Sequence, residues 1–160
     1  MAERSELEEL EALQERARAA VELARDAGAE HAWASAQGSR STQCHVRDGV
    51  LERMQHSHSR RLSVDLYVDG RYFSHSTSDL RDEPLRDFMR EAVALTRALQ
   101  PDPFRALPDA ALFEGRPRVE LDRVDAGLAG LDTDTRVAMA QVMNARIAGK
   151  PGVLSATSNV

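Results

Sequence analysis

Residues Arg60–Leu80 read RRLSVDLYVDGRYFSHSTSDL, and this stretch decides how the chain folds. Aliphatic residues occupy every second position in its first half: Leu62, Val64, Leu66 and Val68. Because successive side chains of a strand point to opposite faces, the alternation predicts a strand with one buried face. Asp69-Gly70 suits the positive φ angles of a type I′ turn, so the chain is expected to return as a second strand over residues 71–76.

A helix is predicted directly after this hairpin. Thr77, Ser78 and Asp79 carry short side-chain oxygens, which accept hydrogen bonds from the free N–H groups at a helix start. Pro84 is suited to the first helical turn, and the apolar spacing continues to about Leu99. The sequence therefore predicts a hairpin followed by a capped helix.

The residues before the hairpin predict one helix and three further strands. The first helix runs from Glu3 to about Asp26, with Leu10, Leu13 and Ala24 among its inward residues, and Gly28 ends it. The strands, separated by turns at Gly38-Ser39 and Asp48-Gly49, are His31–Gln37, Ser41–Arg47 and Val50–Ser59. The fold class is therefore α+β, with an antiparallel meander of about five strands flanked by two helices.

The C-terminal third predicts the start of a second α/β region. Three prolines between Gln100 and Pro108 prevent a helix from continuing there. Thr133 is expected to cap a helix over Asp134–Ala148, with Met143 and Ile147 inward, and a strand follows over Val153–Val160. We divide the chain into an N-terminal domain at 1–100, a proline-rich linker at 101–116 and an incomplete region at 117–160. This unfinished pattern leads us to expect that the natural protein continues.

Composition and charge exclude several classes of protein. The 160 residues are 42% hydrophobic, which is typical of a folded globular chain. The net charge of −5 argues against a nucleic-acid binder, and the excess of acid lies in the first 30 residues. No apolar run is long enough to span a membrane and the N-terminus is no signal peptide. Cys44 has no second cysteine to pair with, so we expect a cytoplasmic protein.

The histidines are the first candidates for a metal site. His56 and His58 are two positions apart on a predicted strand and so share a face, which makes a possible two-point grip on a metal ion. His45 and His75 lie on other strands of the same predicted sheet. Zinc takes three or four ligands in closed geometry, and the spacing does not supply them. We therefore interpret the four as solvent-facing histidines.

No motif with an assigned mechanism occurs in the sequence. The patterns HExxH, HExxxH, CxxC and GxxxxGK[ST] are all absent. Cys44 and His45 are neighbours on a strand, so their side chains are expected on opposite faces. Asp132 and Asp134 are interpreted as acids at a helix start, and no base is placed beside the serines at 41, 57 and 63. We predict no catalytic, cofactor-binding or metal-binding residue.

Four phrases in order resemble the N-terminal domain of the TldD/TldE (PmbA) family, whose members were first called modulators of DNA gyrase. They are GAE at Gly28–Glu30, VRDGVLE at Val46–Glu52, VDLYVDGRYFSHSTSDL at Val64–Leu80 and DPFRALPDAALF at Asp102–Phe113. Residues 109–160 resemble the start of the family's central domain. The phrases are closer to the TldE (PmbA) type than to the TldD type.

The resemblance implies a function that the residues alone do not. In this bacterial family, TldD and TldE subunits form a heterodimeric, cytoplasmic zinc metallopeptidase that degrades or matures peptides. The HExxxH zinc motif belongs to the TldD-type subunit, so no site residue is transferred to this chain. We therefore expect the N-terminal part of a TldE-like subunit, inactive alone, with a TldD-type partner that holds the zinc and with peptide substrates.

Two further hypotheses remain open at this point. One is a stand-alone module that binds a protein partner through its sheet edge or its acidic first helix. The other is a small metal-binding protein that uses His45, His56, His58 or His75.

Overall fold

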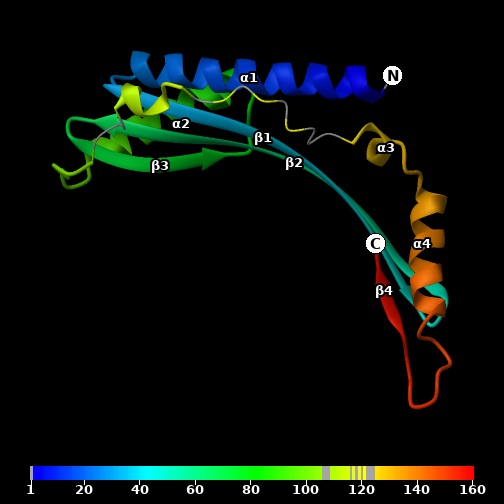
Figure 1. Cartoon of the computed structure of the whole chain (residues 1–160). Helices are drawn as coiled ribbons and strands as arrows, with labels where there is room; N and C mark the ends of the chain where they lie inside the picture. Colours follow the sequence, from blue (N-terminus) through cyan, green and yellow to red (C-terminus); the bar gives the residue numbers. More distant parts are fainter. Residues whose placement is uncertain (1, 106–108, 116, 118, 120, 122–124) are drawn as a thin grey trace. The chain divides into compact units, whose positions relative to one another are not determined.

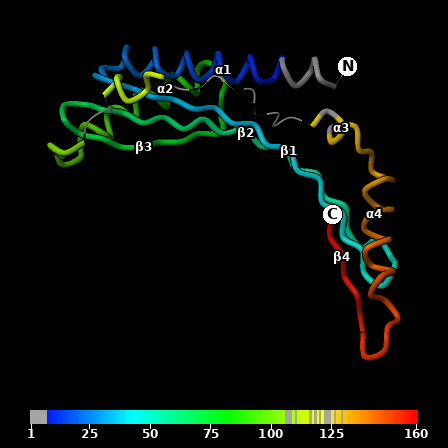
Figure 2. Tube along the Cα trace, in the orientation of Figure 1, coloured from blue at the N-terminus to red at the C-terminus, as the bar shows by residue number. Residues whose placement is uncertain are grey.

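The computed structural model describes residues 2–105, 109–115, 117, 119, 121 and 125–160 (Figures 1 and 2). The chain forms two compact units, each of which draws on separate segments of the sequence. The first unit comprises Arg4–Gly38 and Arg60–Leu121. The second includes Ser39–Ser59 and the C-terminal residues 125–160. No helix among the described residues is both long enough and apolar enough to cross a membrane.

A four-stranded sheet with the order β3-β2-β1-β4 connects the elements. Its strands are β1 (His31–Arg47), β2 (Val50–Val68), β3 (Arg71–Thr77) and β4 (Thr157–Asn159). Strand β3 pairs antiparallel with β2, with Leu66 opposite Phe73 and Tyr67 opposite Tyr72. Strand β4 pairs antiparallel with the end of β1, with Val46 opposite Ser158. The α+β fold class is therefore confirmed.

Both predicted Asp-Gly turns are present. Asp48 and Gly49 have φ angles of 47° and 82°, and Asp69 and Gly70 have φ angles of 50° and 69°. Two consecutive residues with positive φ are the signature of the type I′ turn, whose twist matches that of the flanking strands. The turns therefore fix where β1 ends, where β2 begins and ends, and where β3 begins.

The predicted number of strands is wrong. The chain does not turn at Gly38-Ser39, and it does not break between Ser59 and Leu62, so four of the five expected strands merge into β1 and β2. Gly38 instead lies where helix α1 crosses the strand: a Cβ atom there would lie 3.3 Å from Cδ1 of Leu13. A glycine inside a strand can mark a close approach of this kind as well as a turn.

The core of the first unit lies between the sheet and two helices. These helices are α1 (Ala2–Asp26) and α2 (Asp82–Arg97), and Figure 1 shows α1 lying along the sheet. The alternating aliphatics of β2 are fully buried against them, as predicted, together with Ala20, Ala24, Leu85 and Met89. Leu13 is also buried, but Leu10 is 52% exposed, so the inward face of α1 is shorter than predicted.

Helix α2 begins without the predicted cap. Its N-cap residue is Arg81, whose side chain makes no capping hydrogen bond. The predicted capping oxygens shape the preceding loop instead, because Oγ1 of Thr77 accepts a hydrogen bond from the N–H of Asp79, and Oδ1 of Asp79 accepts one from the N–H of Arg81. Short side chains of this kind stabilise turns as readily as helix starts.

The second unit is built on helix α4 (Thr133–Ala145) and strand β4. Asp132, not Thr133, caps α4, since its Oδ1 accepts a hydrogen bond from the N–H of Thr135 at 2.7 Å. The last strand is shorter than the predicted Val153–Val160, and Met143 and Ile147 are half exposed instead of inward. Two short helical segments precede α4: η1 (Ala110–Phe113) and α3 (Ala126–Ala129).

Candidate functional site

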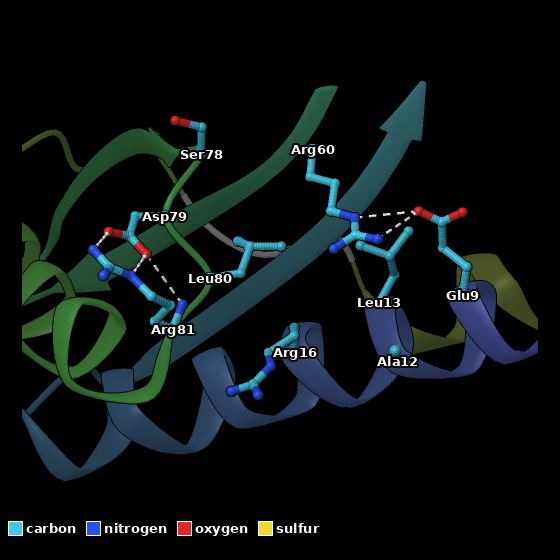
Figure 3. A pocket seen from close by; sticks show the side chains of 9 residues that line it. All are labelled: Glu9, Ala12, Leu13, Arg16, Arg60, Ser78, Asp79, Leu80 and Arg81. Carbon is cyan, nitrogen blue, oxygen red and sulfur yellow. Dashed lines mark hydrogen bonds and ion pairs between the residues drawn. The ribbon is translucent and has the colours of Figure 1, made fainter. Parts of the chain in front are cut away.

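The first unit has a polar cleft among its described residues. It has a volume of about 430 Å³ and lies where α1, β2 and the loop between β3 and α2 meet (Figure 3). Leu13 and Leu80 provide its apolar lining, with Ala12, and Ser78 lies beside them. The remaining lining residues are charged: Glu9, Arg16, Arg60, Asp79 and Arg81.

Each arginine of the cleft is paired with a carboxylate. Arg60 of β2 donates from Nε and Nη2 to Oε1 of Glu9 on α1, at 3.2 and 2.9 Å. Arg81 donates from Nε to Oδ1 of Asp79 at 2.9 Å and from Nη2 to Oδ2. Figure 3 shows both pairs at the cleft, with dashed lines that join Arg60 to Glu9 and Arg81 to Asp79. Two of the three arginines that line the cleft are thus neutralised by the two acids that line it.

The third pair extends this arrangement along α1. Arg16 donates to Asp82, the first residue of α2, and it also lines a neighbouring cleft of about 300 Å³ with Glu22, Leu85 and Arg86. The hydrogen bond from Arg16 lowers the pKa of the Asp82 carboxyl. Since Arg16 and Asp82 are 66 residues apart in the chain, this pair connects α1 to the start of α2.

Asp79 is an acid of the cleft with a lowered pKa. Hydrogen bonds from the side chain and the backbone of Arg81 lower its pKa to about 2. The carboxylate therefore stays ionised at neutral pH and is a weak base there. Ser78 is the only hydroxyl group among the nine described lining residues, and no histidine stands beside it. The nine described lining residues thus offer paired charges, one hydroxyl group and a small apolar surface to a ligand.

The face of the sheet away from the helices carries an aromatic cluster. Alternation along β2 places Asp65 and Tyr67 on the face opposite the buried aliphatics, and the register adds Tyr72 of β3. The two tyrosine rings lie 5.0 Å apart, and the Tyr72 hydroxyl donates to Oδ1 of Asp65 at 3.0 Å. The guanidinium of Arg105 stacks on the Tyr72 ring at 4.8 Å. Burial and the hydrogen bond to Asp65 raise the pKa of Tyr72.

The candidate histidines do not form a ligand cluster. Nδ1 of His45 pairs with Oε2 of Glu52 at 2.9 Å, and Nδ1 of His56 lies 3.1 Å from Oγ1 of Thr42. His58 is on the same strand as His56, whereas His75 belongs to the other compact unit. Across the described part of the chain, no group of three or more His, Cys, Asp or Glu residues is placed to hold a metal ion. The histidine-based metal hypothesis gains no support from these positions.

His75 has a structural role that fixes its tautomer. Its Nε2 lies 2.9 Å from Oγ1 of Thr96, which donates its own proton to the carbonyl of Ala92 at 2.8 Å. The hydroxyl has no second proton, so Nε2 of His75 must be the donor. Phe73 and Phe88 contact the ring with centroid distances of 4.8 and 6.4 Å, and burial lowers the pKa of His75.

Two further expectations about single residues are confirmed. Cys44 is fully buried beside Val46 and Ala140, whereas His45 pairs with Glu52, so the two side chains lie on opposite faces of the strand, as predicted. Asp132 is a helix cap, and its hydrogen bonds from Thr135 lower its pKa.

The residues of the cleft were not predicted from the sequence. Glu9 and Arg60 are 51 residues apart, and no motif or spacing connects them. Ion pairs between distant segments leave no local pattern, because each partner alone resembles any charged surface residue.

Comparisons with known proteins place this fold in a family. The model of PmbA/TldA metallopeptidase domain 1 matches residues 34–96. A crystal structure of a proposed modulator of DNA gyrase from Bacteroides thetaiotaomicron is similar over 91% of this chain, with 31% identity and a TM-score of 0.85. A proposed modulator of a DNA gyrase from Thermotoga maritima is similar in fold over 91% of the chain, with 16% identity and a TM-score of 0.67.

The match covers a part of each relative. This chain spans 33% of the Bacteroides protein and 32% of the Thermotoga protein. No match was found among curated proteins. The family model, the matched fold and the identity to the Bacteroides protein agree with one another, and together they support the placement of the chain in the PmbA/TldD family.

Proposed function

We propose that this chain is the N-terminal part of a TldE (PmbA)-like subunit that is non-catalytic by itself. The subunit belongs to a zinc metallopeptidase of the TldD/TldE type, which degrades or matures peptides in the cytoplasm. The observation that carries the proposal is the match of residues 34–96 to PmbA/TldA metallopeptidase domain 1, and the assignment to the TldE type rests on the phrases of the sequence that resemble that type. The HExxxH motif of the family lies beyond the matched region. A TldD-type partner subunit would supply that motif and its zinc.

The described surfaces support a role in binding and scaffolding. The polar cleft holds paired charges and no nucleophile with an adjacent base. Tyr67 and Tyr72 lie on the helix-free face of the sheet, with Asp65 and Arg105 beside them. This face could contact another domain or a partner subunit. Tyrosine supplies a rigid apolar ring with a polar end, which favours such side chains at interfaces.

The proposal is tested by reconstituting the peptidase from the full-length gene product and the TldD-type subunit of the same source. An unstructured peptide is incubated with each protein alone and with both, and cleavage is followed by mass spectrometry. We expect cleavage when both are present, and we expect a zinc chelator to abolish it.

The matched control replaces the glutamate of the partner's HExxxH motif with glutamine. Cleavage should then disappear although the two proteins still co-purify. Cleavage by the gene product alone, unchanged after further purification, would contradict the non-catalytic role. A pair that co-purifies without cleaving any unfolded peptide would contradict the peptidase assignment.

A further inference from the structure

The polar cleft of the first unit carries one arginine more than its own acids neutralise. Its lining contains three arginines and two acids, and each acid pairs with one arginine. The third arginine, Arg16, pairs with Asp82, which lines the neighbouring cleft but not this one. The side chains of Arg16 and Asp82 are 38% and 77% exposed, and an exposed ion pair contributes little to stability. A ligand can therefore replace Asp82 on Arg16 at little cost.

The pairing with an acid uses only part of each of the other two guanidinium groups. Glu9 accepts from Nε and Nη2 of Arg60, and Asp79 accepts from the same two nitrogens of Arg81. Because a guanidinium carries five N–H groups in one rigid plane, the two on Nη1 lie on another edge of the group. Both arginines are more exposed than their acids, at 51% against 17% for the first pair and 78% against 39% for the second. The acids thus orient donors for a ligand, and such prior orientation lowers the entropy cost of binding.

Apolar side chains and a hydroxyl group lie beside these cations (Figure 3). Leu13 and Leu80 line the polar cleft, and Ser78 adds a hydroxyl donor. Arg16 also lines the neighbouring cleft, which contributes further apolar surface from Leu23 and Leu85. The volume of about 430 Å³ lies within the range of about 300–1,000 Å³ that is usual for small-ligand sites. Cations next to apolar surface fit a ligand that has a carboxylate with short apolar groups beside it.

We propose that the polar cleft binds a peptide through one of its carboxylates, which Arg16 holds with Arg60 and Arg81 around it. A planar guanidinium matches a carboxylate through two parallel hydrogen bonds, which makes arginine well suited to this ligand. An apolar residue next to the acid in the peptide lies on Leu13 and Leu80. The carboxylate belongs to an acidic side chain or to the C-terminus of the peptide. The inference rests on the proposed function, since it names the class of peptide that the subunit receives.

Three tetrapeptides that differ only in their carboxylates test the proposal. Each contains alanine, leucine and one variable residue, and its binding to the full-length gene product, without the partner subunit, is measured by calorimetry. The first has aspartate and a C-terminal amide, the second has asparagine and the amide, and the third has asparagine and a free C-terminus. We expect the first or the third to bind about tenfold more tightly than the second, because the amide peptide with asparagine cannot form charge-assisted hydrogen bonds to arginine. The tighter of the two identifies the source of the carboxylate, and equal affinities of all three peptides would overturn the proposal.

A pair of arginine variants on α1 locates the binding at the cleft. Arg16→Gln should weaken the binding of the preferred peptide by about tenfold and leave that of the asparagine amide peptide unchanged. Arg18→Gln removes the same charge from an exposed position of the same helix that does not line the cleft, and it should leave both affinities unchanged. Equal losses in the two variants would indicate a general effect of charge and would overturn the proposal.

A second pair of variants leaves every arginine in place. Ala12→Glu adds a carboxylate to the lining of the cleft and should weaken the binding of the preferred peptide by about tenfold, because like charges repel. Gln14→Glu adds the same charge at an exposed position outside the lining and should have no effect. Urea unfolding verifies that both variants are folded. Unchanged binding by folded Ala12→Glu would contradict the site.

Inorganic phosphate is the competitor that tests the class of ligand. Displacement of the preferred peptide by phosphate at an equal concentration would show a site for any small anion and would overturn the peptide assignment. The binding measurements contain neither zinc nor the partner subunit, so a failure of the peptidase assay leaves them unaffected. An absence of peptide binding in turn leaves the peptidase assay of the two subunits unaffected.

Discussion

At the scale of single residues, the side chain of Asn144 links three segments of the second unit by hydrogen bonds. Its side chain is buried, and its Oδ1 accepts a hydrogen bond from the N–H of Gly49 at 2.8 Å. Its Nδ2 donates to the carbonyl of Ala156 at 2.7 Å and to that of Val46 at 3.4 Å. One amide thus satisfies backbone groups of the β1–β2 turn and of the segment that leads into β4. An asparagine inside a helix pattern gives no indication of this role in the sequence.

Asn144→Ala should lower the free energy of unfolding by about 2 kcal/mol, since it leaves buried backbone groups without partners. Urea denaturation measures the loss, and amide hydrogen exchange should show faster exchange of the Gly49 N–H. Gln141→Ala, at an exposed position of the same helix, is the control and should have little effect. An equal loss in both variants would show that Asn144 makes no special contribution.

Asp79 gives the cleft a defined response to acid. Its pKa is lowered from 3.8 to about 2 in the folded protein, so its contribution to stability is complete above about pH 4. That contribution is lost as the pH falls toward 2 and the carboxylate is protonated. Arg81→Gln removes the donor responsible, and the pKa of Asp79 should rise toward its ordinary value. Titration of the Asp79 carboxyl carbon by NMR measures this directly, and identical titration curves would contradict the pairing.

At the scale of elements, the two Asp-Gly turns determine the sheet. Gly70 has a φ of 69°, and no atom lies within 4 Å of the place where a Cβ would be. Glycine is therefore needed at this position because of the positive φ angle, and not because a side chain would clash. The same holds for Gly49, with a φ of 82°.

Gly70→Ala should cost about 1 kcal/mol of folding free energy, because an L-residue with a side chain disfavours the left-handed region. Thermal or urea unfolding measures the cost. Gly130→Ala is the control, since Gly130 has a φ of −85° and room for an added Cβ. It should leave the stability unchanged or raise it slightly. A larger loss for Gly130→Ala than for Gly70→Ala would refute the turn argument.

Local patterns in the sequence were sufficient to predict the helices, strands and turns that depend on residues close together in the chain. The alternation of Leu62 to Val68, both Asp-Gly turns and the spans of α1 and α2 to within about two residues follow from periodicity and turn chemistry. Gly38 was misread because its cause, the approach of Leu13 from α1, is long-range. The ion pair between Glu9 and Arg60 and the hydrogen bonds of Asn144 also join residues that are far apart in the chain. No short stretch of sequence contains both partners, so these contacts could not be predicted.

At the scale of the whole molecule, the chain combines a unit with a full core and a unit with a small one. It matches PmbA/TldA metallopeptidase domain 1 over residues 34–96 and spans about a third of the length of two crystal structures with a similar fold. The domain boundaries at residues 100 and 116 stay predictions. The zinc, the TldD-type partner and the peptide substrate stay proposals that the reconstitution assay addresses.

The measurement that tests the central claim most directly is the natural reading frame, sequenced past the codon for Val160. We expect a frame that continues to about three times the present length, as in the two relatives, and that encodes no HExxxH motif. A downstream HExxxH would make this a catalytic TldD-type subunit and would contradict the non-catalytic role. A stop codon at Val160 would contradict the assignment to a longer TldE-like subunit and would leave a stand-alone binding module with this fold.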